Sequence, residues 1–117
     1  MATKGADKSQ IRSGEALDVV TLVDYGQGAI VSRTILDNNA GTITLFSFDE
    51  GQGLSEHTAP FDALVQVLDG QGEFIVGGKA HNVRAGQVLL MPANVPHAVK
   101  AARRFKMLLT MLRAKGK

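Results

Sequence analysis

The sequence predicts a single all-β domain, a sandwich or barrel of short antiparallel strands. Three observations support this prediction. Apolar and β-branched residues gather in short runs, glycine-, asparagine- and aspartate-rich turns separate the runs at intervals of about 8–12 residues, and no stretch has a convincing helical period. The length of 117 residues, with 44% hydrophobic and 21% charged residues, fits one soluble globular domain.

The elements follow from these runs in chain order. Residues 1–14 are polar, show no apolar period and are expected to form a loose, flexible tail, and residues 15–117 are expected to form one barrel. Glycine-rich stretches at 49–53, 69–72 and 77–79 are expected to be turns. Strands are expected at 29–36, 42–48, 63–68, 73–76, 80–83, 87–91, 97–101 and 105–112.

The last of these segments, FKMLLTML at 105–112, is ambiguous because its residues also favour a helix. Phe105, Met107, Leu109 and Met111 recur at every second position and would share one face of a strand. This period of two favours a strand over a helix.

Charge is distributed unevenly along the chain. Residues 1–73 hold all 11 acidic residues and 4 basic ones, whereas residues 74–117 hold 9 basic residues and no acidic one. The basic residues near the end alternate with apolar ones, which favours two halves that interleave in one fold over a nucleic-acid-binding tail. Aromatic residues make up only 5% of the chain, so base-stacking platforms are scarce. We expect no nucleic-acid partner.

Composition also limits the compartment and the chemistry. The chain has no cysteine, which excludes disulfides, thiolate nucleophiles and cysteine-type zinc sites. No apolar run reaches about 18 residues, so no membrane span and no membrane partner are expected. The first residues, MATKGADKSQ, lack the apolar core of a signal peptide. A cytoplasmic protein is expected.

Two histidines are the candidate functional residues. His57 precedes a predicted strand, and His97 lies in the segment PANVPHAV. If both face the interior of one barrel, they could bind a divalent transition metal, although a catalytic metal normally needs about three protein ligands. Strand alternation predicts a cavity around them. The residues expected to line it are Phe46, Phe48, Val65, Met91 and Val99.

Residues 51–70 and 86–101 resemble the two sequence motifs of the cupin superfamily, and the chain is similar to its small single-domain, cupin-2-like barrel proteins. In the first motif the matching residues are Gly51, His57 and Gly70, whereas Ala59 and Ala63 replace a histidine and a glutamate. In the second the matching residues are Gly86, Pro92 and His97, whereas Asn94 and Ala101 replace a glycine and an asparagine. Asparagine still tolerates the left-handed turn that glycine would form.

The resemblance implies a double-stranded β-helix, the jelly-roll barrel of cupins. It also implies a metal site of three histidines and one glutamate, which holds Mn, Fe, Ni, Zn or Cu in many cupins, while other cupins bind small ligands without metal. Only positions 57 and 97 keep such ligands here, so the metal motif is incomplete. Asp62, next to the usual glutamate position, is the leading substitute ligand, and Gln66 and His81 are weaker alternatives.

Two functions therefore remain open. The first is binding of a small molecule in the barrel cavity beside a degraded two-histidine site. The alternative is a metal-dependent dioxygenase or isomerase in which His57, His97 and Asp62 hold one divalent ion of Fe, Mn, Ni or Zn. No catalytic residue and no organic cofactor are predicted. A homodimer is expected because Leu64, Gln66 and Leu68, or strand 105–112, offer a second apolar face.

Overall fold

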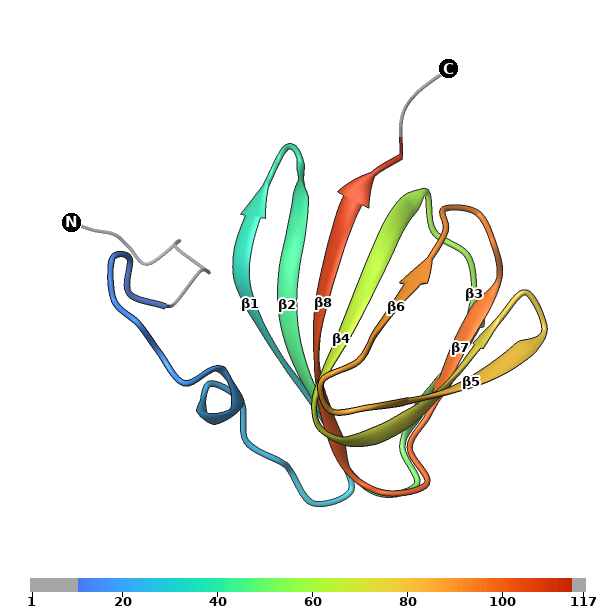
Figure 1. The fold of residues 1–117 in the computed structure, drawn as a ribbon, viewed down its shortest axis with the longest axis horizontal. Helices are drawn as coiled ribbons and strands as arrows, with labels where there is room; N and C mark the ends of the chain where they lie inside the picture. Colours follow the sequence, from blue (N-terminus) through green and yellow to red (C-terminus); the bar gives the residue numbers. More distant parts are fainter. Residues whose placement is uncertain (1–10, 115–117) are drawn as a thin grey trace.

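The computed structural model describes residues 11–114, and its regular secondary structure is almost entirely β-strand (Figure 1). Residues 1–10 of the predicted tail lie outside the described residues. Within 11–114 no helix is long and apolar enough to cross a membrane. A short 3-10 turn, η1 (Val19–Thr21), precedes eight strands: β1 (Ile30–Asn38), β2 (Gly41–Phe48), β3 (Gly53–His57), β4 (Phe61–Val76), β5 (Lys79–Arg84), β6 (Val88–Met91), β7 (His97–Lys100) and β8 (Phe105–Arg113).

The strands form two antiparallel sheets that share strand β4. Sheet 1 has the order β1-β2-β8-β4-β6, and sheet 2 has the order β3-β7-β4-β5. The first half of β4 pairs with β6 and β8, and its second half pairs with β5 and β7. Figure 1 shows β4 bending from one group of strands to the other. The predicted all-β jelly-roll barrel is confirmed.

The continuity of β4 corrects the prediction of separate strands at 63–68 and 73–76. Residues 69–72 form no reversing turn. They lie within β4, which continues from sheet 1 into sheet 2. The pairing with β8 is irregular between Val67 and Asp69, and Gly70 has a φ of 73°. This irregularity moves the buried face from odd positions such as Val65 to even positions such as Phe74. Gly70 can adopt this positive φ without strain, so here glycine allows the strand to change its buried face and does not form a hairpin turn.

Strand β3 is the one strand that the sequence pattern did not predict. Its sequence, GLSEH, holds a single partly buried apolar residue, Leu54, and it pairs only with β7 at the edge of sheet 2. An edge strand that is exposed along most of its length carries little apolar alternation. Segment 105–112, by contrast, is confirmed as a strand, β8.

Stacked aromatic rings form the core at the point where the two sheets meet. Phe105 stacks on Phe48 with ring centroids 4.7 Å apart, and the edge of Phe74 meets Phe105 at 5.8 Å. All three side chains are fully buried. Aromatic pairs in such geometries stabilise a core beyond the area that they bury.

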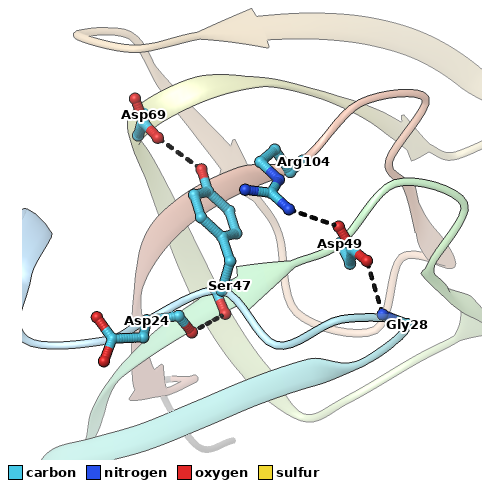
Figure 2. A network of polar contacts seen from close by, with 7 residues as sticks. Asp24, Gly28, Ser47, Asp49, Asp69 and Arg104 are labelled. Carbon is cyan, nitrogen blue, oxygen red and sulfur yellow. Dashed lines mark hydrogen bonds and ion pairs between the residues drawn. The ribbon is translucent and has the colours of Figure 1, made fainter.

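The segment before β1 is fastened along the outer face of sheet 1. The hydroxyl of Ser47 donates to the backbone oxygen of Asp24 at 2.8 Å, and the backbone N–H of Gly28 donates to Asp49 at 2.6 Å (Figure 2). Tyr25 donates its hydroxyl to Asp69 at 2.6 Å. Burial and this hydrogen bond raise the pKa of Tyr25 above its ordinary value. Leu45, on the same outward face of β2 as Ser47, is also fully buried.

The acidic and basic halves of the chain meet within one fold. Arg104 contacts Asp49 at 3.4 Å, as Figure 2 shows. Glu73 of β4 lies opposite Lys100 of β7, and Asp69 lies opposite Lys106 of β8. The uneven charge along the sequence therefore reflects strands that pair across the two halves.

Candidate functional site: a two-histidine cavity

A cavity of about 210 Å³ lies between the two sheets and is the candidate functional site. Sheet 1 supplies apolar side chains from β2, β4, β6 and β8, and sheet 2 supplies both histidines from β3 and β7. Ten of the lining residues are apolar. The lining residues are Phe46, Leu54, His57, Ala59, Phe61, Ala63, Met91, His97, Val99, Met107, Leu109 and Met111.

The pairing of β3 with β7 brings the two histidines together. His57 ends β3, His97 begins β7, and the two are direct partners in the antiparallel register. Their ring centroids lie 4.4 Å apart, with the ring planes inclined at 68°. Two imidazoles at this separation can act on the same bound group.

Backbone hydrogen bonds place a proton on the Nδ1 atom of both rings. Nδ1 of His57 lies 2.8 Å from the carbonyl oxygen of Ser55, and Nδ1 of His97 lies 3.2 Å from that of Val95. Because a carbonyl oxygen only accepts, Nδ1 carries a proton in each ring, and Nε2 has a free lone pair whenever the ring is neutral. The Nε2 atom of His97 has no hydrogen-bond partner, and within residues 11–114 every fully buried side-chain nitrogen or oxygen has one. Nε2 of His97 is therefore not fully buried and is accessible from the cavity.

His97 is held in its neutral form. It is one of two buried polar residues in the described part of the chain, with 8% of its surface exposed. Burial lowers the pKa of His97 because the imidazolium would lose its hydration, and the nearby His57 lowers it further. The hydrogen bond to Val95 opposes this shift without cancelling it.

All four positions at which the motifs suggest ligands line this one cavity. His57 and His97 present imidazoles, whereas Ala59 and Ala63 present methyl groups that cannot bind a metal. The loop before β7 is built as the second motif suggests, because Asn94 has a φ of 65° and its N–H donates to Ala59 at 2.8 Å. The incomplete motif therefore still shapes the cavity.

Asp62 does not lie with the histidines. Its neighbour Ala63 faces the cavity, so alternation directs Asp62 to the outer face, where its Oδ1 accepts the N–H of Ala93 at 2.9 Å. Gln66 shares this face, and His81 lies on β5 opposite Phe74, away from the lining residues. Within residues 11–114 no three histidine, aspartate or glutamate side chains gather into a metal site. These residues do not fit a three-ligand divalent centre.

Three of the five predicted lining residues, Phe46, Met91 and Val99, border the cavity. Phe48 and Val65 do not border it, because they are fully buried in the core, where Phe48 stacks on Phe105. The prediction missed three lining residues of β8, although their shared face was visible in the sequence. These residues are Met107, Leu109 and Met111.

The curled pair of sheets, with the two-histidine cavity between them, defines a double-stranded β-helix barrel. The chain belongs to the cupin family, because the cupin domain matches residues 44–111. No curated protein matches the chain significantly.

Three solved structures similar to this chain cover 80–91% of it. A conserved protein of unknown function from Streptococcus pyogenes is 35% identical, with a TM-score of 0.85 over 91% of this chain and 93% of that one. A cupin 2 conserved barrel domain protein from Leptotrichia buccalis is 42% identical, with a TM-score of 0.78, over 80% of this chain but only 46% of that longer one. A cupin superfamily protein from Desulfitobacterium hafniense is 26% identical over 89% of this chain and 95% of that one, with a TM-score of 0.83.

Proposed function

We propose that the protein binds a small, largely apolar organic molecule in the cavity between the sheets. The observation that carries this proposal is the lining, in which ten apolar residues surround two imidazoles whose Nδ1 atoms are engaged by backbone carbonyls. Ligand sites typically combine apolar walls with a few convergent polar groups. An apolar cavity of about 150 Å³ holds benzene, so 210 Å³ suits a molecule with one ring.

The histidines favour a neutral ligand that donates a hydrogen bond. Because both Nδ1 protons are used on backbone carbonyls, each Nε2 can only accept while the ring is neutral. The lowered pKa of His97 keeps that ring neutral near pH 7, so an anion would find no donor at His97. A phenol or an alcohol has the required polarity.

The test compares phenol, toluene and benzoate, which have similar sizes, by calorimetric titration and by methyl NMR of the protein. Phenol is expected to bind and to shift the methyl resonances of Val99 and Leu109. Benzoate is expected to bind at least about tenfold more weakly, because its carboxylate loses hydration and meets no donor. Toluene is expected to fall between them.

Variants locate the polar contact. His97→Leu is expected to reduce phenol binding toward the toluene value, whereas His81→Leu, on β5 and away from the cavity, is expected to leave it unchanged. Preferential binding of benzoate, or the absence of any shift at the cavity methyls, would refute the proposal.

The alternative, a metal-dependent dioxygenase or isomerase, has one observation in its favour. Histidines that bind metals commonly donate their other ring N–H to a backbone carbonyl, as His57 and His97 do. The expected third ligand, Asp62, is engaged with Ala93 instead. A two-histidine, one-carboxylate centre for Fe, Mn, Ni or Zn therefore has weaker support than organic ligand binding.

A further inference from the structure

An open polar pocket of about 670 Å³ lies at the far end of the barrel from the two histidines. His97 begins β7, whereas the arginines of this pocket lie in the loop that follows β7 and leads into β8 (Figure 1). The crossing of β4 between the two sheets forms the other side of the pocket. The lining residues are Asp69, Gly70, Gln71, Arg103 and Arg104.

Two side chains of the pocket offer hydrogen-bond donors that no other described residue uses. Within residues 11–114 the side chains of Arg103 and Gln71 take part in no hydrogen bond or ion pair. An arginine side chain carries only donors, and the glutamine amide adds an NH₂ group. A ligand rich in acceptor atoms therefore suits this lining.

Arg104 is held beside these two residues without using all of its donors. Its guanidinium carbon lies 4.6 Å from the centre of the Tyr25 ring, and one of its nitrogens lies 3.4 Å from Asp49 (Figure 2). Stacking on an aromatic ring restrains the flexible arginine side chain. The other guanidinium nitrogens have no partner among residues 11–114. A ligand that used them would cost Arg104 little additional side-chain freedom.

The carboxylate in the lining, Asp69, is engaged by neighbouring groups. It accepts the hydroxyl of Tyr25 at 2.6 Å, and it lies opposite Lys106 in the pairing of β4 with β8. The ammonium of Lys106 lies 5.0 Å from the centre of the same tyrosine ring. Even with Asp49 beside Arg104, the basic groups around the pocket outnumber the acidic ones, which favours an anion.

We propose that this pocket binds a phosphate group of a small anion through Arg103, Arg104 and the amide of Gln71. Phosphate oxygens accept several hydrogen bonds at once, and a planar guanidinium meets them with two parallel donors. The pocket has room for a second phosphate or for an organic group attached to the first. The site does not rest on the proposed function, since it shares no residue with the cavity between the sheets.

The experiment titrates full-length ¹⁵N-labelled protein with inorganic phosphate, pyrophosphate and glycerol phosphate, with sodium chloride at equal ionic strength as the reference. The phosphates are expected to shift the amide signals of Gly70, Gln71 and Arg103 and to leave that of Gly78, in the turn between β4 and β5, in place. Added salt is expected to weaken binding, because exposed charges are screened. The tightest binder among the three probes identifies free phosphate, a diphosphate or a phosphate ester as the source.

Variants of Arg103 test the contact, with thermal melts as the check of folding. Arg103→Gln is expected to weaken binding of the tightest probe at least about fivefold, the effect of one partly exposed charge pair. Arg103→Lys keeps the charge but loses the planar pair of donors, so its affinity is expected to fall between those of Arg103→Gln and the parent. Lys79→Gln removes the same charge at the other end of the β4–β5 pairing and is expected to stay within about twofold of the parent.

An Arg103→Gln variant that keeps the parent affinity would overturn the site. A Lys79→Gln variant that loses as much as Arg103→Gln would also overturn it, because binding would then follow the charge of the whole chain. Sodium chloride that produces the same shifts as the phosphates would mean that the pocket does not recognise phosphate. None of these results bears on the binding of phenol in the cavity between the sheets.

Discussion

His97 links the fold to the chemistry of the cavity. It begins β7, places its ring against His57 and donates its Nδ1 proton to Val95. Burial lowers its pKa, so the folded chain takes up a proton at His97 less readily than the unfolded chain does. A buried histidine near its titration range makes stability depend on pH.

The sign of this dependence follows from the lowered pKa. Above the unfolded value of about 6.5 the contribution of neutral His97 to stability is fully present. As the pH falls, the unfolded chain is protonated first, and stability is lost until the pH passes below the folded pKa. Thermal melts between about pH 5 and pH 8 are expected to show Tm falling toward acid.

The control for this dependence is another histidine. His97→Leu is expected to flatten the acid side of the Tm profile, whereas His81→Leu on β5 keeps the parent slope. Equal slopes in all three proteins would mean that groups other than His97 cause the loss of stability.

The sequence predicted the histidine pair and part of the apolar lining, but not the orientation of Asp62 or the lining residues of β8. Both histidines line one cavity. This could be predicted because the motifs around His57 and His97 resemble those of cupins, whose strands bring the two positions together. The orientation of Asp62 could not be read reliably, because an irregularity of one residue at the start of a strand reverses a side chain. In the structure it simply follows the alternation that Ala63 sets and bonds to Ala93.

At the scale of the elements, β4 connects the two sheets over 16 residues. Where it crosses between them it passes directly over the Phe105 ring, and a Cβ added at Gly72 would lie 2.6 Å from that ring. Phe105 cannot move aside easily because it stacks on Phe48 and meets Phe74. The absence of a side chain at position 72 is therefore a packing requirement.

Gly72→Ala is expected to destabilise the protein by about 1–3 kcal/mol, the usual cost of overpacking a core. The corresponding fall in Tm is roughly 5–15 °C. Chemical and thermal unfolding measure this loss. A double-mutant cycle with Phe105→Leu tests the cause, because a smaller side chain at 105 makes room for the new methyl group.

In that cycle, the double variant is expected to be more stable than the sum of the two single losses predicts. Simple additivity would show that Gly72 matters for its backbone rather than for the space above Phe105.

Most strands could be predicted because each buries alternate residues on one side. β4 and β3 were the exceptions, for different reasons. The stretch DGQG at 69–72 has the composition of a turn, yet Gly70 and Gly72 serve a crossing between sheets, which only the packing against Phe105 reveals. β3 forms a strand because it pairs with β7, which is distant in the sequence. This pairing is not visible in the composition of residues 53–57.

At the scale of the whole molecule, the outer face of sheet 1 is only partly covered by its own chain. Near β2 the segment that contains Asp24 is bonded to Ser47, and Leu45 and Ser47 of this face are fully buried. Toward β6 the η1 residues Val19 and Val20 border Val88, yet Val88 and Leu90 are each 59% exposed. Leu64 of β4 lies directly beside Leu90 and extends this apolar face inward. An exposed apolar face of this kind marks an interaction surface.

We expect two copies of the chain to pack these faces together as a homodimer. Since β6 is an edge strand that pairs only with β4, a twofold axis beside it would bring Leu90 and Val88 of each copy against the other. Light scattering coupled to size exclusion is expected to give twice 12.4 kDa. A mass of 12.4 kDa at micromolar concentration would contradict the dimer.

The variant Leu90→Glu tests which face is used. A buried, unpaired carboxylate in each copy is expected to raise the dissociation constant at least about a hundredfold, equivalent to about 3 kcal/mol. Leu36→Glu is the matched control, because Leu36 is also exposed but lies on β1, at the opposite edge of sheet 1. If Leu36→Glu dissociates the dimer and Leu90→Glu does not, the interface lies at the β1 edge, and the apolar face at β6 must be covered by something other than a second copy.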